Sequence, residues 1–169
     1  METNVTPKYD ISNNETNCCP KFDPAPWDGQ ALIFKDKLFV KAKTTNVFHI
    51  PLGMGKMYKK TFSSIQSADA VNWNQFVCLS HDPSPWKGEH FFAVTKEVQG
   101  QEMVRLTGNF VTKVFEGPFR DAGQWCKAMN EYVRQKGKET QKLYFFYTTC
   151  PKCAKHYHKN YVVGFAQIQ

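Results

Sequence analysis

The feature that most constrains the fold is a segment that occurs twice in the chain. Thr45–Leu52, TNVFHIPL, matches Thr112–Phe119, TKVFEGPF, with Thr, Val, Phe and Pro recurring at an offset of 67 residues. The same offset relates three pairs of apolar positions further on: Tyr58 and Trp125, Phe62 and Met129, and Ile65 and Tyr132. A nearly constant offset across several elements indicates a duplicated module.

Each copy predicts one strand, one helix and then two more strands. Runs of β-branched and aromatic residues indicate the strands, and apolar residues at helical spacing indicate the helices. In the first copy the strands fall at 37–50, 75–80 and 89–98 and the helix at 54–70, with the turn-rich loop HDPSPWKG before the last strand. In the second copy the strands fall at 103–115, 143–148 and 161–168 and the helix at 121–136.

Three strands and one helix cannot bury both faces of a sheet, so the two copies are expected to share one. The sequence therefore predicts an α+β fold of duplicated β-α-β-β modules, with one antiparallel sheet, both helices on one face and a ligand groove on the other. The domain is predicted at 37–169, with repeats at 37–98 and 102–169. Residues 1–36 lack helical periodicity, so we expect an extended segment that packs on the domain and contains no DNA-binding helix.

Three stretches of the chain resemble the GyrI-like family of small-molecule-binding domains, over about residues 37 to 168. LTGNFVTKVFEGPFRDAGQWCKAMNEYV is similar to that family's strand, Gly-Pro-aromatic turn and Trp-containing helix. YFFYTTCP resembles its Tyr and Pro at four-residue spacing, and SHDPSPWKGEHFFAV resembles its Asp-Pro loop and following strand. The order of these motifs and the duplication carry the resemblance.

The resemblance implies a stand-alone ligand-binding protein. Some such members are hydrolases that open strained cyclopropanes in DNA-alkylating natural products, and others only bind cationic or aromatic ligands. The family often has an acidic residue two positions before the Tyr of the last hairpin, where this chain has Phe145 before Tyr147. Neither cation binding nor that hydrolysis therefore transfers directly to this chain.

Glu116 and His49 occupy equivalent positions in the two copies, each at the end of a first strand. If the copies are related by a pseudo-two-fold axis, these side chains approach each other and can act as base and acid. The alternative is that Glu116 caps the following helix and His49 is only packed. Four aromatic residues are expected to line the groove: Trp86, Tyr147, Phe110 and Phe145. For Trp86 and Tyr147 the alternative is packing in the core or at the rim.

A second candidate site contains cysteines. Cys150 and Cys153 have the C-x-x-C spacing that lets two thiolates bind one tetrahedral ion, and Cys18 and Cys19 offer a second half-site. The hypothesis is a structural zinc that ties the N-terminal segment to the last hairpin, with His156 or His158 able to replace one cysteine. The alternatives are a redox pair, a nucleophilic cysteine with His156 as base, and a basic loop with reduced thiols. The redox hypothesis is weaker because such pairs open a helix, whereas this stretch is predicted to be a hairpin loop.

Charge and hydropathy limit the partners. The net charge is +7, but the lysines are scattered and no nucleic-acid-binding signature accompanies them, so nucleic acid is an unlikely partner. The N-terminus has no apolar core and no run approaches the about 20 residues of a membrane span, so we expect a cytoplasmic protein with reduced thiols. Cys78 and Cys126 are expected in the core, and no organic cofactor is indicated.

Two functions follow as hypotheses. The first is a protein that binds a small hydrophobic or aromatic ligand in the groove, and that is a hydrolase of a hydrophobic or electrophilic compound if it is an enzyme. The second is a thiol or zinc protein whose functional centre is the Cys150–Cys153 segment. The sequence does not indicate the oligomeric state.

Overall fold

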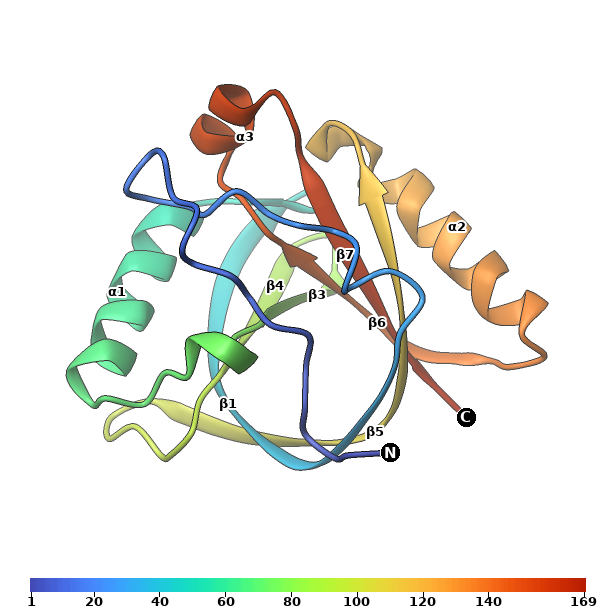
Figure 1. Cartoon of the computed structure of the whole chain (residues 1–169), viewed down its shortest axis with the longest axis horizontal. Helices are drawn as coiled ribbons and strands as arrows, with labels where there is room; N and C mark the ends of the chain where they lie inside the picture. Colours follow the sequence, from blue (N-terminus) through green and yellow to red (C-terminus); the bar gives the residue numbers. More distant parts are fainter.

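Pairing between the first and fifth strands closes the sheet into a barrel. The computed structural model describes residues 1–169. Its seven-stranded antiparallel sheet has the order β2-β1-β4-β3-β6-β7-β5, and β1 also pairs with β5 (Figure 1). The strands are β1 (Ala31–Val47), β2 (Ile50–Pro51), β3 (Cys78–Ser84), β4 (Lys87–Ala93), β5 (Glu102–Glu116), β6 (Thr140–Tyr147) and β7 (Tyr161–Ile168). The helices are α1 (Met54–Ser67), α2 (Ala122–Gln135) and α3 (Pro151–Tyr157), with short 3-10 turns at Trp73–Gln75 and Phe119–Asp121.

The two predicted copies form equivalent parts of the barrel. β1, α1, β3 and β4 make one part, and β5, α2, β6 and β7 make the other. In each part the first strand pairs with the last, and the last two strands pair with each other in antiparallel fashion. The parts join along β1 and β5 on one side and at the single pair Ser80–Phe145 on the other. The predicted α+β fold is confirmed, and the chain adds β2 and α3 to the repeated pattern.

Both long helices pack on the outer face of the sheet, as predicted, and flank the strands in Figure 1. In α1, the ring of Tyr58 lies 5.1 Å from that of Phe92 on β4. In α2, Met129 packs over Gly164 on β7, where an added Cβ would lie 2.9 Å from the Met129 sulfur. None of the helices combines the length and the hydropathy needed to cross a membrane.

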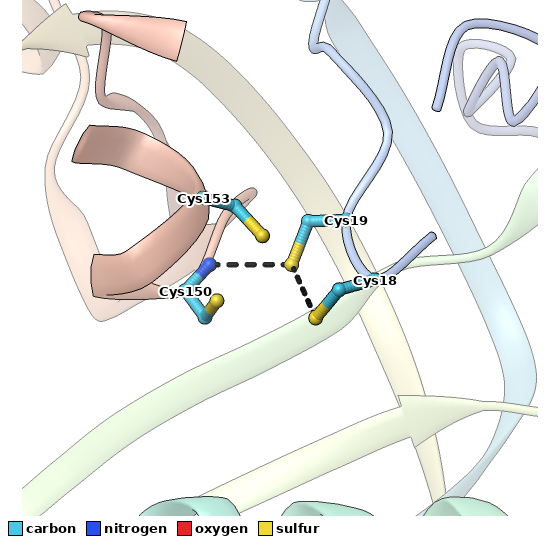
Figure 2. A group of neighbouring side chains, drawn as sticks. All are labelled: Cys18, Cys19, Cys150 and Cys153. Carbon is cyan, nitrogen blue, oxygen red and sulfur yellow. Dashed lines mark hydrogen bonds between the residues drawn. The ribbon is translucent and has the colours of Figure 1, made fainter. Parts of the chain in front are cut away.

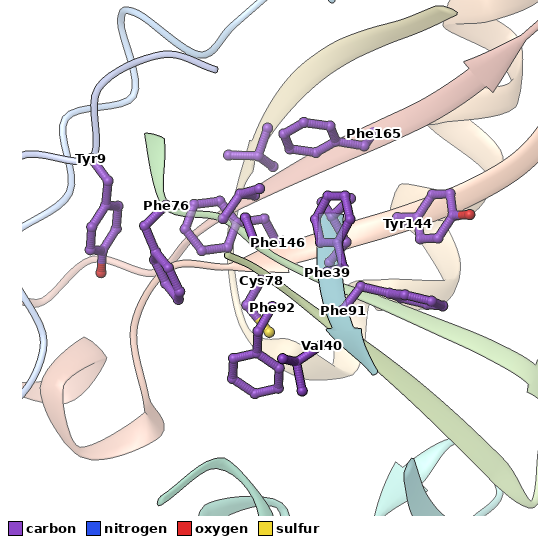
Figure 3. Close-up of a cluster of buried hydrophobic side chains, with 14 of the residues drawn as sticks. Tyr9, Phe39, Val40, Phe76, Cys78, Phe91, Phe92, Tyr144, Phe146 and Phe165 are labelled. Carbon is purple, nitrogen blue, oxygen red and sulfur yellow. The ribbon is translucent and has the colours of Figure 1, made fainter. Parts of the chain in front are cut away.

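The other face of the sheet is the inside of the barrel, and aromatic side chains fill it (Figure 3). Side chains alternate along a strand, so Phe91 points inward because its neighbour Phe92 contacts α1. Phe91 packs there against Phe39 and Tyr144, with ring centroids 6.5 and 5.7 Å away. The face on which we predicted a ligand groove is therefore the inside of a closed barrel, where Phe39, Phe91 and Tyr144 pack together.

The N-terminal segment forms a strap, residues 3–30, that crosses the barrel in Figure 1. Trp27 is only 1% exposed and packs against Phe146 of β6, at a ring-centroid distance of 5.4 Å. Tyr9 and Phe22 are also buried and contact the same phenylalanine. The strap thus contributes three aromatic side chains to the core of the barrel.

The first strand begins earlier than predicted, at Ala31 rather than Lys37. Residues from Ala31 onward pair with β5, but the register shifts between Phe34 and Lys37. Asp36 has a φ of 51° there, which breaks the alternation of side chains. This irregularity hides the start of the strand from a periodicity argument.

The loop predicted between the strands at 75–80 and 89–98 is instead a tight hairpin. β3 continues to Ser84 and β4 begins at Lys87, so only Pro85 and Trp86 lie between them. Pro83 is tolerated within β3 because that strand pairs with β6 only at Ser80, and no ladder hydrogen bond is lost. The hairpin carries Asp82 on a strand rather than on a loop.

Candidate functional site

A row of polar side chains lies on the outer face of β1, β3 and β4, between otherwise apolar positions. Val40 and Phe92 on this face are fully buried, yet the next positions along the strands are polar. Thr44, Asn46, Ser80 and His90 are all at most 8% exposed. We call the connected set the Asp82 cluster: Ser80, His90, Thr44, Asn46, Asp82 and His49.

The buried end of the cluster has a defined direction of hydrogen bonding. Thr44 Oγ1 donates to Asn46 Oδ1 at 2.9 Å, so it accepts from His90 Nε2, which also lies 2.9 Å away. His90 Nδ1 then accepts from Ser80 Oγ at 2.8 Å. Burial lowers the pKa of His90 to about 4, against a smaller opposing effect of Asp82 and Glu89, so the ring is neutral.

The exposed end of the cluster is a His–Asp pair. Asn46 Nδ2 donates to Asp82 Oδ1 at 3.1 Å, and His49 Nδ1 lies 3.1 Å from Asp82 Oδ2. A carboxylate only accepts, so His49 carries its proton on Nδ1, and its Nε2 makes no hydrogen bond within the chain. Backbone bonds hold this histidine, since His49 N donates to Pro85 O at 2.8 Å.

An apolar surface surrounds the His–Asp pair. Phe48 is 72% exposed and its ring lies 4.9 Å from that of Trp86, which is 51% exposed. The β1–β2 hairpin adds three further exposed apolar side chains: Val47, Ile50 and Leu52. A large patch of exposed apolar residues often marks a binding surface. This apolar surface is exposed to solvent next to the His–Asp pair.

The other flank of Asp82 reaches β6 and α2. Phe145 pairs with Ser80, so Phe145 and Tyr147 lie on the same face as the cluster. Burial, and then the negative charge of Asp82, raise the pKa of the Tyr147 hydroxyl well above its ordinary value. The same two causes raise the pKa of the Cys126 thiol. Both groups therefore stay protonated at neutral pH, and Asp82 is the charged group of this face.

The four predicted metal-ligating cysteines lie together, although they come from opposite ends of the chain (Figure 2). The sulfurs of Cys18, Cys19, Cys150 and Cys153 all lie within 4.8 Å of one another. Sulfurs around a tetrahedral zinc are about 3.8 Å apart, and Cys18 Sγ lies 3.7 Å from Cys19 Sγ. The cluster is thus within the distance that one metal ion can bridge.

Hydrogen bonds to sulfur organise this cysteine cluster. The amide of Cys150 donates to Cys19 Sγ at 3.4 Å, and Thr16 Oγ1 lies 3.3 Å from Cys153 Sγ. Burial raises the pKa of Cys153, but hydrogen bonds from Thr16, the Cys19 amide and neighbouring thiols lower it to about 7 overall. The Cys153 sulfur is therefore suited to carry negative charge, whereas burial raises the pKa of the Cys18 and Cys19 thiols.

The segment between β6 and β7 is not the hairpin loop that we predicted. Pro151 starts the helix α3, with Cys150 as its N-cap residue and Cys153 in its first turn. Proline at the first helical position favours this start. The argument that weakened the redox hypothesis was therefore wrong, because the C-x-x-C pair does open a helix after a strand.

The comparisons with known proteins give the family. A family model described as bacterial hydrolase matches residues 9–168. The chain belongs to this bacterial hydrolase family. The search of curated proteins found no match.

Solved structures at 12% identity share the fold of this chain. An uncharacterized conserved protein from Listeria innocua aligns with a TM-score of 0.60 over 84% of this chain and 92% of its own. A hydrolase from Listeria innocua aligns with a TM-score of 0.56 over the same shares. SAV2435, solved bound to tetraphenylphosphonium, aligns with a TM-score of 0.51 over 84% of this chain and 94% of its own.

The two predicted catalytic residues, His49 and Glu116, do not contact each other. His49 pairs with Asp82, whereas Glu116 Oε1 accepts from Lys159 Nζ at 2.9 Å. Glu116 lines a separate cavity of about 260 Å³, together with Gly117, Pro118, Ala154, His158, Lys159 and Asn160.

The predicted binding residues also divide between the two faces of the sheet. Trp86 lies next to the His–Asp pair, and Phe145 and Tyr147 lie on its face. Phe110 is 1% exposed inside the barrel, against Phe34 at 4.7 Å. Trp125 is buried against Phe115, as expected of a core residue.

Sequence reasoning missed most of the Asp82 cluster. The sequence did contain a signal for buried polar groups. Thr44 and Asn46 are polar and two positions apart, so they share a strand face that is otherwise hydrophobic. Gly88 was a second signal, because a Cβ at that position would collide with Thr44 Oγ1. His156 and His158 do not join the cysteines, since His156 Nε2 pairs with Glu15 at 3.1 Å and His158 ends α3 with a φ of 54°.

Proposed function

We propose that the chain is a GyrI-like hydrolase of small hydrophobic compounds, with His49 as its general base. The observation that carries the proposal is the His49–Asp82 pair, with a free Nε2 beside exposed Phe48 and Trp86. The membership of a hydrolase family supports a hydrolytic reaction. Glu116, the other candidate, is engaged by Lys159 and lies away from an apolar surface.

The proposed reaction uses a water molecule. His49 Nε2 takes a proton from the water as its oxygen bonds to the electrophilic carbon of the substrate. The bond to the leaving group then breaks, and the proton passes from Nε2 to that group. Asp82 holds the imidazole in the required tautomer and stabilises its positive charge, as carboxylates do in other His–Asp pairs.

The substrate class follows from the surface around the pair. Phe48 and Trp86 provide aromatic contact area, and Asp82 provides one negative charge. Aromatic faces and a nearby carboxylate favour hydrophobic molecules that carry delocalised positive charge. Tetraphenylphosphonium, the ligand of the related SAV2435 structure, has this chemistry. We propose a hydrophobic aromatic substrate, and the electrophilic group within it is the position that water attacks.

The test uses a second histidine of the same chain as a control. His49 and His156 are similarly exposed, and each lies 3.1 Å from a carboxylate, but only His49 lies beside the apolar surface. The hydrolysis of hydrophobic p-nitrophenyl esters is measured for the wild type, His49→Gln and His156→Gln. The expected result is a fall in kcat/KM of about 100-fold for His49→Gln alone. Equal rates for the two variants would remove His49 from the reaction.

We also propose that the cysteine cluster binds one Zn²⁺ as a structural ion. The geometry of the four sulfurs supports this, because zinc prefers four thiolate ligands at about 2.3 Å in a tetrahedral arrangement. The alternative, a dithiol that is itself the functional centre, requires that Cys150 and Cys153 be free to react. Elemental mass spectrometry of protein purified without a His-tag decides between them, because the zinc proposal expects about one zinc per chain.

A further inference from the structure

The hydrogen bonds that attach the middle of the strap to the rest of the molecule all reach α3 and its N-cap. Residues 10–21 are mostly exposed and contain no helix or strand. Each hydrogen bond that leaves this segment ends within Cys150–Tyr157. The contacts include Tyr157 Oη donating to Cys19 O at 2.8 Å and the amide of Glu15 donating to Tyr157 Oη at 3.2 Å.

The α3 helix depends on the strap in the same way. It has only 7 residues, and isolated helices shorter than about 12 residues are marginal in water. Its single buried side chain is Cys153, which contacts Thr16 of the strap. Two elements that are weak alone therefore hold each other, and the four cysteine sulfurs lie where they meet.

This contact fixes a larger piece of the core. Tyr9 precedes the exposed segment, and Phe22 and Trp27 follow it, and all three bury their rings against Phe146. If residues 10–21 were released from α3, these aromatic side chains would keep their packing against Phe146 but lose the support of the segment that joins Tyr9 to Phe22. A cross-link at the cysteine cluster would shorten the free loop and favour the docked strap.

We propose that a Zn²⁺ ion at the cysteine cluster is the clasp that keeps the strap docked, so that metal occupancy controls whether the end of the barrel is covered. The inference rests on the zinc site proposed above. Binding displaces one proton from each thiol, so Zn²⁺ and four thiols give a tetrathiolate site of charge −2 and four protons. Lys152 and Lys155 on α3 and Lys21 on the strap supply positive charge in the adjoining sequence.

The test compares the full chain with and without metal. Zinc is removed by a chelator under reducing conditions and then restored, and amide hydrogen exchange is followed by mass spectrometry. In the metal-free chain, amides of residues 3–30 and of α3 are expected to exchange at least about tenfold faster, while amides of β1 and β5 stay protected. Cys153→Ser is expected to resemble the metal-free chain, and Cys126→Ser, whose thiol lies outside the cluster, to resemble the wild type.

The outcomes distinguish the clasp proposal from the zinc-site proposal. A chain that binds zinc but shows the same strap exchange without it overturns the clasp and leaves the zinc site intact. A reduced chain that takes up no zinc, or a chain in which the cluster contains a disulfide, overturns both. Chelation changes no residue, so the comparison holds even if Cys153→Ser does not fold.

Discussion

His49 Nδ1 lies 3.1 Å from Asp82 Oδ2, at the exposed end of a hydrogen-bonded row that begins at buried Ser80. Each donor in the row points toward the carboxylate, because Ser80, His90, Thr44 and Asn46 donate in turn. Aligned hydrogen bonds of this kind strengthen one another in a low dielectric. The buried row therefore directs its last donor, Asn46 Nδ2, at the carboxylate that pairs with His49.

Replacing the carboxylate tests whether this alignment matters. Asp82→Asn keeps the size of the side chain but lets its amide donate to His49 Nδ1, which would place the imidazole proton on Nε2. We expect kcat/KM for ester hydrolysis to fall by about 100-fold or more. Asp69→Asn, at an exposed turn after α1, is the control and should retain full activity. Unchanged activity in Asp82→Asn would contradict the proposed tautomer.

The aromatic pair is predicted to bind ligand without supporting the fold. Trp86→Ala and Phe48→Ala remove exposed rings, so we expect Kd for tetraphenylphosphonium to rise about tenfold in each. The midpoint of thermal unfolding should stay within about 3 °C of the wild type. Isothermal titration calorimetry gives the first quantity, and Ile11→Ala, which trims an exposed side chain of the strap, serves as control. If all three variants bind alike, the ligand lies elsewhere.

The lowered pKa of His90 predicts how the free energy of unfolding changes in acid. In the folded chain the pKa of His90 is about 4, below its ordinary value of 6.5. Between pH 6.5 and pH 4 the imidazole is therefore protonated in the unfolded chain but not in the native chain. Stability should therefore fall as the pH drops from 6.5 to 4, by about 3 kcal/mol from this residue. The lowered pKa of His81, caused first by burial, adds a loss in the same direction.

Urea unfolding from pH 7 to pH 4 measures this effect. His90→Gln is expected to be less stable at pH 7, because its amide can replace the donor at Nε2 but leaves Ser80 Oγ without the acceptor that Nδ1 provides. Its free energy of unfolding should, however, fall less steeply with acid than that of the wild type. Parallel curves for the two proteins would show that His90 is not a buried neutral histidine.

Replacing a glycine by alanine is expected to have opposite effects on stability at two positions of the second repeat. At Gly164 a Cβ would lie 2.9 Å from Met129 Sδ and 3.2 Å from a Phe115 ring carbon, so Gly164→Ala should destabilise by about 1–3 kcal/mol. At Gly123, within α2, no atom lies within 4 Å of the added Cβ. Gly123→Ala should therefore stabilise by about 0.5–1 kcal/mol. Chemical denaturation of both variants measures the difference, and a stabilised Gly164→Ala would contradict the packing of α2 on β7.

Much of the fold was predictable because the duplicated pattern fixes the order of elements. The stripe that contains Trp125, Met129 and Val133 is buried, as its helical spacing indicates. The cysteine half-sites were also predictable, because C-x-x-C spacing carries its own geometry. What the sequence could not show was that β1 pairs with β5, since closure of a barrel depends on strand pairs distant in sequence. Without closure, Phe110 seemed available to a groove, whereas it is inside the barrel.

The Asp82 cluster was hidden for a different reason. Its members lie on three strands, and only the register of those strands brings His90 between Ser80 and Thr44. A Pro-rich stretch favoured a loop at Asp82, although an unpaired edge of β3 accommodates Pro83. The partner of His49 was therefore sought in the other repeat, at Glu116, rather than on the neighbouring strand.

The strap also joins positions that lie far apart in the sequence. Cys18 and Cys19 meet Cys150 and Cys153, and Cys150 lies 131 positions after Cys19. Tyr9 and Trp27 likewise bury their rings against Phe146, which lies far from them in the sequence. Contacts between such distant positions form slowly, because a long stretch of chain must be ordered first. Docking of the strap over the barrel is therefore expected to come late in folding, after β6 has joined the sheet.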